Sequence, residues 1–199
     1  MKIAMDKNQT ATASHRKSNN RKHVDLIGMG IELIPVPLPF GDYCMITPTM
    51  EETMQRRGKK LKKSDLVGDI KVTIDTKKNL LEVAQNICTS SHNRFRDEVI
   101  LAQKCGCKMI ILVEDADIES VNDVFSWQNP RMERYNKINY MHKIGKWGDI
   151  PTPKKPPVNG KTLAKAMLTM QNKYNIIWQF SDRNKSAQKI VELLEENNK

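Results

Sequence analysis

The 199-residue chain carries 33 lysines and arginines against 23 aspartates and glutamates, a formal net charge of +10 at pH 7. A chain of this length can bury a core that needs no disulfide or structural metal, so we expect a single domain over residues 1–199. The longest apolar run, Met109 to Val113, is far shorter than the roughly 18 residues that a membrane-spanning helix requires. A membrane-spanning protein is therefore excluded.

Positive charge of this size is typical of proteins with an anionic partner, nucleic acid first among them. The N-terminus lacks the apolar segment of a secretory signal, and the four cysteines are too few for a disulfide framework. The close pair Cys105 and Cys107 has no second pair beside it, so reduced thiols are a better interpretation than a metal site. We expect a cytoplasmic protein, associated with the nucleoid or with phage-infected bacterial cytoplasm.

The charge is concentrated in two segments. Six of the eight residues from Arg56 to Lys63 are cations, which predicts a mobile basic hairpin loop over residues 50–69. Residues 126–160 form an aromatic and basic insertion whose second half is rich in proline and glycine. One such segment could be a solvated loop, but two in a small protein favour contact with phosphate.

Between these segments, strand and helix patterns alternate. Short strands are expected at Lys2–Asp6, Ile31–Leu38, Tyr43–Ile46 and Ile70–Ile74, and its prolines predict that the second lies at a sheet edge or contains a bulge. The later elements are a helix capped by Asn79, a helix over 93–105, a strand over 109–113, a helix over 162–173, a strand over 175–180 and a helix over 185–196. This order predicts an α/β fold with a mixed central β-sheet flanked by helices.

Charged residues stand at the ends of two of these strands. Asp75 and Lys77 lie two apart, so their side chains share a face if the strand persists, and Asp42 is the expected neighbour across the hairpin. Two carboxylates on adjacent strands can share Mg²⁺, and a lysine can orient the attacking water or stabilise charge on phosphate. Taken singly, Gly41-Asp42 is more often a turn and Asp75-x-Lys77 an exposed ion pair. Their order along the chain favours a site.

That order resembles the nuclease domain of the XPF-type (ERCC4-domain) structure-specific endonucleases, within the restriction-endonuclease-like PD-(D/E)XK fold. Lys2–Asp6 corresponds to the first strand and its acid, residues 39–43 to the GD motif, and the IDTK sequence at 74–77 to the family's ERK. The HNRFRDE sequence at 92–98 extends the resemblance, which covers about 160 residues outside the insertion. More narrowly, the chain is similar to short bacterial and phage proteins that consist of this nuclease domain.

The resemblance implies a metal-dependent DNA endonuclease that hydrolyses phosphodiester bonds at branched or junction DNA, in repair, recombination or phage DNA processing. Its cofactor would be Mg²⁺ or Mn²⁺ and its partner DNA, with a homodimer left open. The implied metal ligands are Asp6, Asp42 and Asp75, and the implied catalytic residues are Asp42, Asp75 and Lys77. The expected DNA-binding residues are Arg56, Arg57, Lys59, Lys60, Lys62, Lys63 and Arg94. Glu82 and Glu98 would support the site from outside the metal ligands.

The sequence departs from the family pattern in two places. DTK keeps the acid and the lysine of ERK but lacks the arginine, and the trailing acid of the motif falls on Leu81. Glu82 is the nearest substitute, about 100° away around a helix. No helix-hairpin-helix module fits in the chain, so DNA contact must come from elsewhere.

The alternatives concern the insertion, an acidic cluster and the activity itself. Interleaved aromatic and basic residues in the insertion suit unpaired bases and phosphates, but a core or dimer-interface role for Trp127 and Tyr135 is equally open. The acidic residues from Glu114 to Glu119 are more often a solvated turn than metal ligands. A catalytically inactive member of the fold that binds DNA or a partner nuclease is the main rival function, and an RNA-binding protein of another fold is a third.

Overall fold

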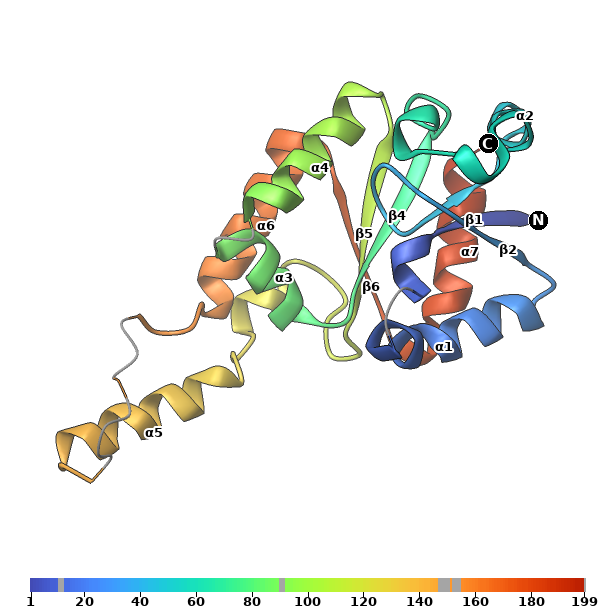
Figure 1. Ribbon diagram of the computed structural model, residues 1–199. Helices are drawn as coiled ribbons and strands as arrows, with labels where there is room; N and C mark the ends of the chain where they lie inside the picture. Colours follow the sequence, from blue (N-terminus) through green and yellow to red (C-terminus); the bar gives the residue numbers. More distant parts are fainter. Residues whose placement is uncertain (11–12, 90–91, 147–150, 152–154, 199) are drawn as a thin grey trace.

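A mixed six-stranded sheet forms the centre of the protein in the computed structural model, which describes residues 1–10, 13–89, 92–146, 151 and 155–198 (Figure 1). The strands lie in the order β2-β1-β3-β4-β5-β6. In chain order they are β1 (Lys2–Asp6), β2 (Glu32–Val36), β3 (Tyr43–Met45), β4 (Val72–Lys77), β5 (Lys108–Glu114) and β6 (Ile177–Ser181). The predicted mixed α/β sheet flanked by helices is confirmed.

The direction of β3 determines where the strand ends meet. β3 is antiparallel to both of its neighbours, β1 and β4, whereas β1 is parallel to β2 and β4, β5 and β6 are mutually parallel. The carboxyl ends of five strands and the amino end of β3 therefore lie along one edge of the sheet. We call this the functional edge.

Helices cover both faces of the sheet (Figure 1). They are α1 (Ala13–Gly28), α2 (Pro48–Arg57), α3 (Leu80–Cys88), α4 (His92–Lys104), α5 (Arg131–Lys143), α6 (Gly160–Tyr174) and α7 (Ser186–Asn197). The apolar stripes of α3, α4 and α6 form one core with alternate residues of β5, and α7 forms a second core with the remaining β5 residues on the other face. Asn79 caps α3 as predicted, accepting a hydrogen bond from Glu82 N. None of the described helices is long and apolar enough to cross a membrane.

The basic segment at 50–69 does connect two antiparallel strands, but the prediction that it is a loop is wrong. Thr47 caps α2, whose first residue is Pro48, and short 3₁₀ turns η2 (Gly58–Lys60) and η3 (Lys63–Asp65) follow. Apolar residues on either side of the cations anchor the segment, since Met50 and Leu66 are fully buried in the core. Asp65 forms an ion pair with one of the six cations, Arg57, at 3.0 Å.

The predicted insertion contains a helix that projects from the body. α5 extends from the side of the molecule occupied by α3 and α6, as Figure 1 shows at lower left. Trp127, at the start of the insertion, packs against the main core. Residues 147–150, which include Trp147, and residues 152–154 lie outside the described part of the chain.

Candidate functional site

The functional edge brings three aspartates together. Asp6 ends β1, Asp42 immediately precedes β3, and Asp75 lies near the end of β4. Backbone hydrogen bonds hold the three strand ends in register, since Asp6 N donates to Asp42 O at 2.9 Å and Asp42 N donates to Ile74 O at 2.7 Å. Residues far apart in sequence are thus placed side by side by the sheet itself.

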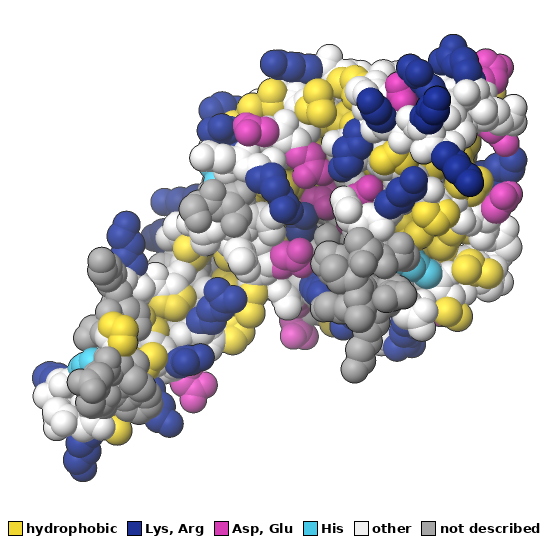
Figure 2. Space-filling view, in the orientation of Figure 1, with side chains coloured by type: hydrophobic (Ala, Val, Ile, Leu, Met, Phe, Trp, Pro, Cys, Tyr) yellow, Lys and Arg dark blue, Asp and Glu magenta, His cyan; other side chains and the backbone are white. Residues whose placement is uncertain are grey.

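These strand ends border a cleft of about 740 Å³. In the space-filling view, acidic side chains gather in the middle of the body with basic side chains around them (Figure 2). Of the residues predicted to form the site, the following line the cleft: Asp6, Asp42, Lys63, Asp75, Lys77, Glu82, Arg94 and Glu98. Arg56, Arg57, Lys59, Lys60 and Lys62 are exposed but are not among the lining residues.

Asp75 and Lys77 form a buried ion pair, with 2.5 Å between Lys77 Nζ and Asp75 Oδ2. Both side chains are less than a tenth exposed, and both project from the same buried face of β4. Phe95 of α4 covers the lysine, whose Nζ lies 5.1 Å from the centre of the ring. The pair is therefore not the exposed ion pair that the sequence alone would most often indicate.

Burial and neighbouring charges change the titration of this pair. Burial raises the pKa of Asp75 to about 7; Lys77 opposes this, while Asp42 and Glu98 add to it. Burial by itself would lower the pKa of Lys77, but Asp75 and Asp42 outweigh it and the pKa is raised. Lys77 therefore stays protonated near neutral pH and can act as a cation and hydrogen-bond donor, not as a base.

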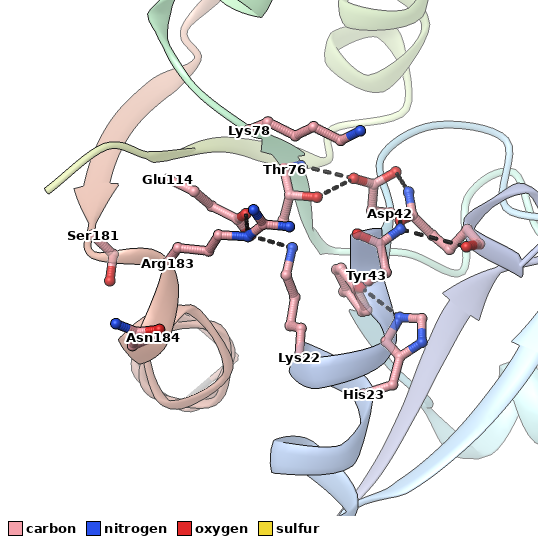
Figure 3. Close-up of polar contacts among 12 residues, drawn as sticks. Lys22, His23, Asp42, Tyr43, Thr76, Lys78, Glu114, Ser181, Arg183 and Asn184 are labelled. Carbon is pink, nitrogen blue, oxygen red and sulfur yellow. Dashed lines mark hydrogen bonds and ion pairs between the residues drawn. The ribbon is translucent and has the colours of Figure 1, made fainter. Parts of the chain in front are cut away.

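Asp42 is held by three donors. Gln9 Nε2 donates to Oδ1 at 2.5 Å, and the backbone N and Oγ1 of Thr76 donate to Oδ2 at 2.8 and 2.6 Å (Figure 3). Gln9 in turn accepts a hydrogen bond from the amide of Asn19 on α1. The carboxylate orientation is thus set by β4 on one side and by the N-terminal segment on the other.

Gly41 makes the turn that aims Asp42 into the cleft. Its φ of +67° favours glycine, and a Cβ at this position would lie 2.1 Å from Thr73 Oγ1. Glu98 on α4 accepts a hydrogen bond from Gly41 N at 2.8 Å, so it fixes this turn. The GD motif is therefore both a turn and a site element.

The remaining predicted residues lie around the aspartates. Asp6 accepts hydrogen bonds from Asn8 and from Leu38 N. Burial raises the pKa of Asp6 above its ordinary value, although the nearby charge of Lys63 opposes this shift. Glu82 accepts from Lys78 N at 2.9 Å while its own N donates to Asn79, so this carboxylate holds the turn that leads into α3. Arg94 is exposed at the cleft wall.

Three charged residues that line the cleft were not predicted as site residues: Lys22, Lys78 and Glu114. Glu114, at the end of β5, is buried and forms an ion pair with buried Lys22 on α1, and Arg183 Nε lies 3.9 Å from its other oxygen (Figure 3). Interpreting the acids after β5 as a solvated turn is wrong for Glu114. The position of Glu114 at the end of a continuous apolar strand could have indicated that it lies at the same sheet edge as Asp75.

The carboxylates at the cleft are the kind of ligand that a hard divalent cation binds. Carboxylate oxygens are what Mg²⁺ prefers, and those of Asp42 and Asp75 line the cleft, with Asp75 Oδ2 already paired with Lys77 Nζ. Within the described residues, however, no three His, Cys, Asp or Glu side chains converge as a ready metal-binding group. Asp42 and Asp75, with Asp6 beside them, are the residues that would hold a cation.

The fold has the architecture of restriction-endonuclease-like nuclease domains, and comparisons with solved structures agree. XPF from Aeropyrum pernix superposes with a TM-score of 0.55 at 16% sequence identity, over 100% of this chain and 66% of that one. The same protein in a complex with DNA gives a TM-score of 0.51 at 15% identity, over 99% and 64%. The chain therefore spans about two thirds of the length of these structures, and the likeness shows the fold.

The family follows from the sequence match. The model of the ERCC4 domain matches residues 11–193, nearly the whole chain, so this protein belongs to the ERCC4 domain family. The resemblance to the XPF-type nuclease domain is thereby confirmed. The comparison with curated proteins gave no match.

Proposed function

We propose that this protein is a DNA endonuclease that uses Mg²⁺ or Mn²⁺ to hydrolyse phosphodiester bonds, with branched or junction DNA as its substrate. The observation that carries the proposal is the convergence of Asp6, Asp42, Asp75 and Lys77 at one cleft on the functional edge. Membership of the ERCC4 domain family and the XPF nuclease fold support it. That the related XPF structure was determined with DNA supports the choice of partner.

The residues have separable roles in this proposal. Asp42 and Asp75, assisted by Asp6, would hold the cation, which would supply a nucleophilic water at neutral pH and neutralise charge on the phosphate. Lys77 would donate hydrogen bonds to the attacking water or to a phosphate oxygen. Glu98 would keep Gly41 and hence Asp42 in place. Lys63 and Arg94 at the cleft would contact the DNA backbone.

A cleavage panel tests the activity. Purified protein should cut at least one of flap, fork and four-way junction DNA in Mg²⁺ or Mn²⁺, and EDTA should stop the reaction. Asp42→Asn should abolish cleavage. Glu195→Gln, which neutralises an exposed acid near the C-terminus of α7, should leave it unchanged. Absence of cleavage by the unaltered protein on every substrate in either metal would overturn the proposal.

Two observations favour a second candidate, a catalytically inactive DNA-binding or partner-binding member of the fold. Asp75 is already neutralised by Lys77, and the described residues hold no ready group of three metal ligands. In that case Asp42→Asn would leave DNA affinity unchanged or raise it, and Mg²⁺ would give no binding signal. The same purified proteins distinguish the two candidates.

A further inference from the structure

The projecting helix α5 has an exposed surface that does not line the cleft. α5 contains four lysines and arginines against a single acid, Glu133. Only Ile138 of its 13 residues is buried. α5 has no continuous apolar face and buries one side chain, so packing of the core does not account for this helix.

Hydrogen bonds and close packing fix the base of this helix to the body of the protein. The side chain of buried Asn129 donates to Val158 O at 2.7 Å and accepts from Arg131 N at 3.0 Å, so it ties together the chain segments that enter and leave the insertion. At the start of α6, Gly160 lies so close to η4 (Asp123–Ser126) that a Cβ would be 2.3 Å from Val124 O. The arm, defined as residues 129–146, is therefore an ordered projection.

The charges on the arm form one row that winds around α5, so Arg131 lies on the opposite side of the helix from Tyr140, whereas Lys137 and Lys143 flank Tyr140. Residues three apart are neighbours on a helix surface, and the sequence places a cation or an aromatic ring at five consecutive positions of this spacing. They are Arg131, Arg134, Lys137, Tyr140 and Lys143. In the space-filling view, basic side chains follow the arm outward from the body (Figure 2). Tyr140 is 62% exposed between two lysines.

We infer that the Arg134–Lys143 part of this row binds a single-stranded segment of DNA, with phosphates on its cations and a base stacked on Tyr140. A run of cations alone suits any nucleic acid backbone, but an exposed ring set between cations is what unpaired bases require. Bases inside a duplex present no free face to such a ring. The inference rests on the proposed function for its choice of DNA, and it adds the strand type and the residues that hold it.

Binding measured in EDTA tests the inference without cleavage. The unaltered protein should bind a duplex with a single-stranded tail more tightly than a blunt duplex of the same length. Tyr140→Ala should weaken binding of the tailed DNA about tenfold and spare the blunt duplex, because only an unpaired base can stack on the ring. Tyr140→Phe keeps the ring and should bind as the unaltered protein does.

A charge-matched pair of variants isolates the cations. Arg134→Gln with Lys137→Gln should lower the slope of log affinity against log salt by about 1 to 2, the share of two phosphate contacts. Lys71→Gln with Lys104→Gln removes the same charge from exposed sites at the opposite edge of the sheet and should leave the slope unchanged.

Two results overturn the inference. One is binding of the tailed DNA by Tyr140→Ala and by the arm double variant as tightly as by the unaltered protein. The other is an equal loss by Tyr140→Ala on blunt and tailed DNA. Failure of cleavage with these binding differences intact would reject the endonuclease and keep the arm as a single-strand contact, so the two proposals fail separately.

Discussion

Burial determines the chemistry of the charged residues at the end of β4. Asp75 and Lys77 are each less than a tenth exposed, so burial and the neighbouring charges determine how readily each side chain ionises. The pKa of Asp75 rises to about 7, whereas Lys77 stays cationic. At neutral pH the cleft therefore contains one carboxyl group that is partly protonated, and any cation must compete with that proton.

This competition predicts a pH-dependent metal affinity. Mg²⁺ binding should release protons and should tighten as the pH rises from 6 to 8, because the carboxyl group of Asp75 must be ionised to serve as a ligand. Isothermal titration calorimetry in two buffers of different ionisation enthalpy measures the proton release. Lys77→Met removes the charge that lowers the pKa of Asp75, so it should move the dependence to higher pH. A pH-independent affinity without proton release would contradict this.

At the scale of elements, strand periodicity and strand-end order predicted more than loop composition did. The strands that carry Asp6, Asp42 and Asp75 were predictable because alternation and turn residues are local signals. The helical structure of 48–57 was missed because the density of cations concealed the buried Met50 and the Thr47 cap. The pairing of Glu114 with Lys22 was missed because α1 carries no clear apolar stripe and the partners lie 92 positions apart.

Close packing between α6 and η4 gives an element-scale prediction. Gly160→Ala places a Cβ against two backbone carbonyls, at 2.3 Å from Val124 O and 2.6 Å from Trp127 O, and should lower the free energy of unfolding by about 2 kcal/mol or more. Gly28→Ala, at the end of α1 with open space around it, should change it by less than about 1 kcal/mol. Urea unfolding of the two variants measures the difference. Equal stabilities would contradict this, because they would show that the base of the arm tolerates a side chain at position 160.

The charge of the whole molecule has a spatial order that the net value of +10 conceals. Acids gather at the cleft, and cations lie around it and along the arm (Figure 2). DNA approaching this face would meet positive potential first and carboxylates only at the cleft, where a cation would offset them. The arrangement suits a protein that holds phosphates over a wide surface and reacts with one of them.

Single-turnover cleavage of a flap duplex in Mg²⁺ tests the central claim most directly, provided that DNA affinity is measured beside it. We expect the unaltered protein to cleave, and Asp75→Asn to bind the DNA at least as tightly but to cleave about a hundredfold more slowly or worse. Glu195→Gln should match the unaltered protein in both measurements. Equal cleavage rates for the unaltered protein and Asp75→Asn, or no cleavage by either, would contradict the assignment of the cleft as a metal-dependent nuclease site.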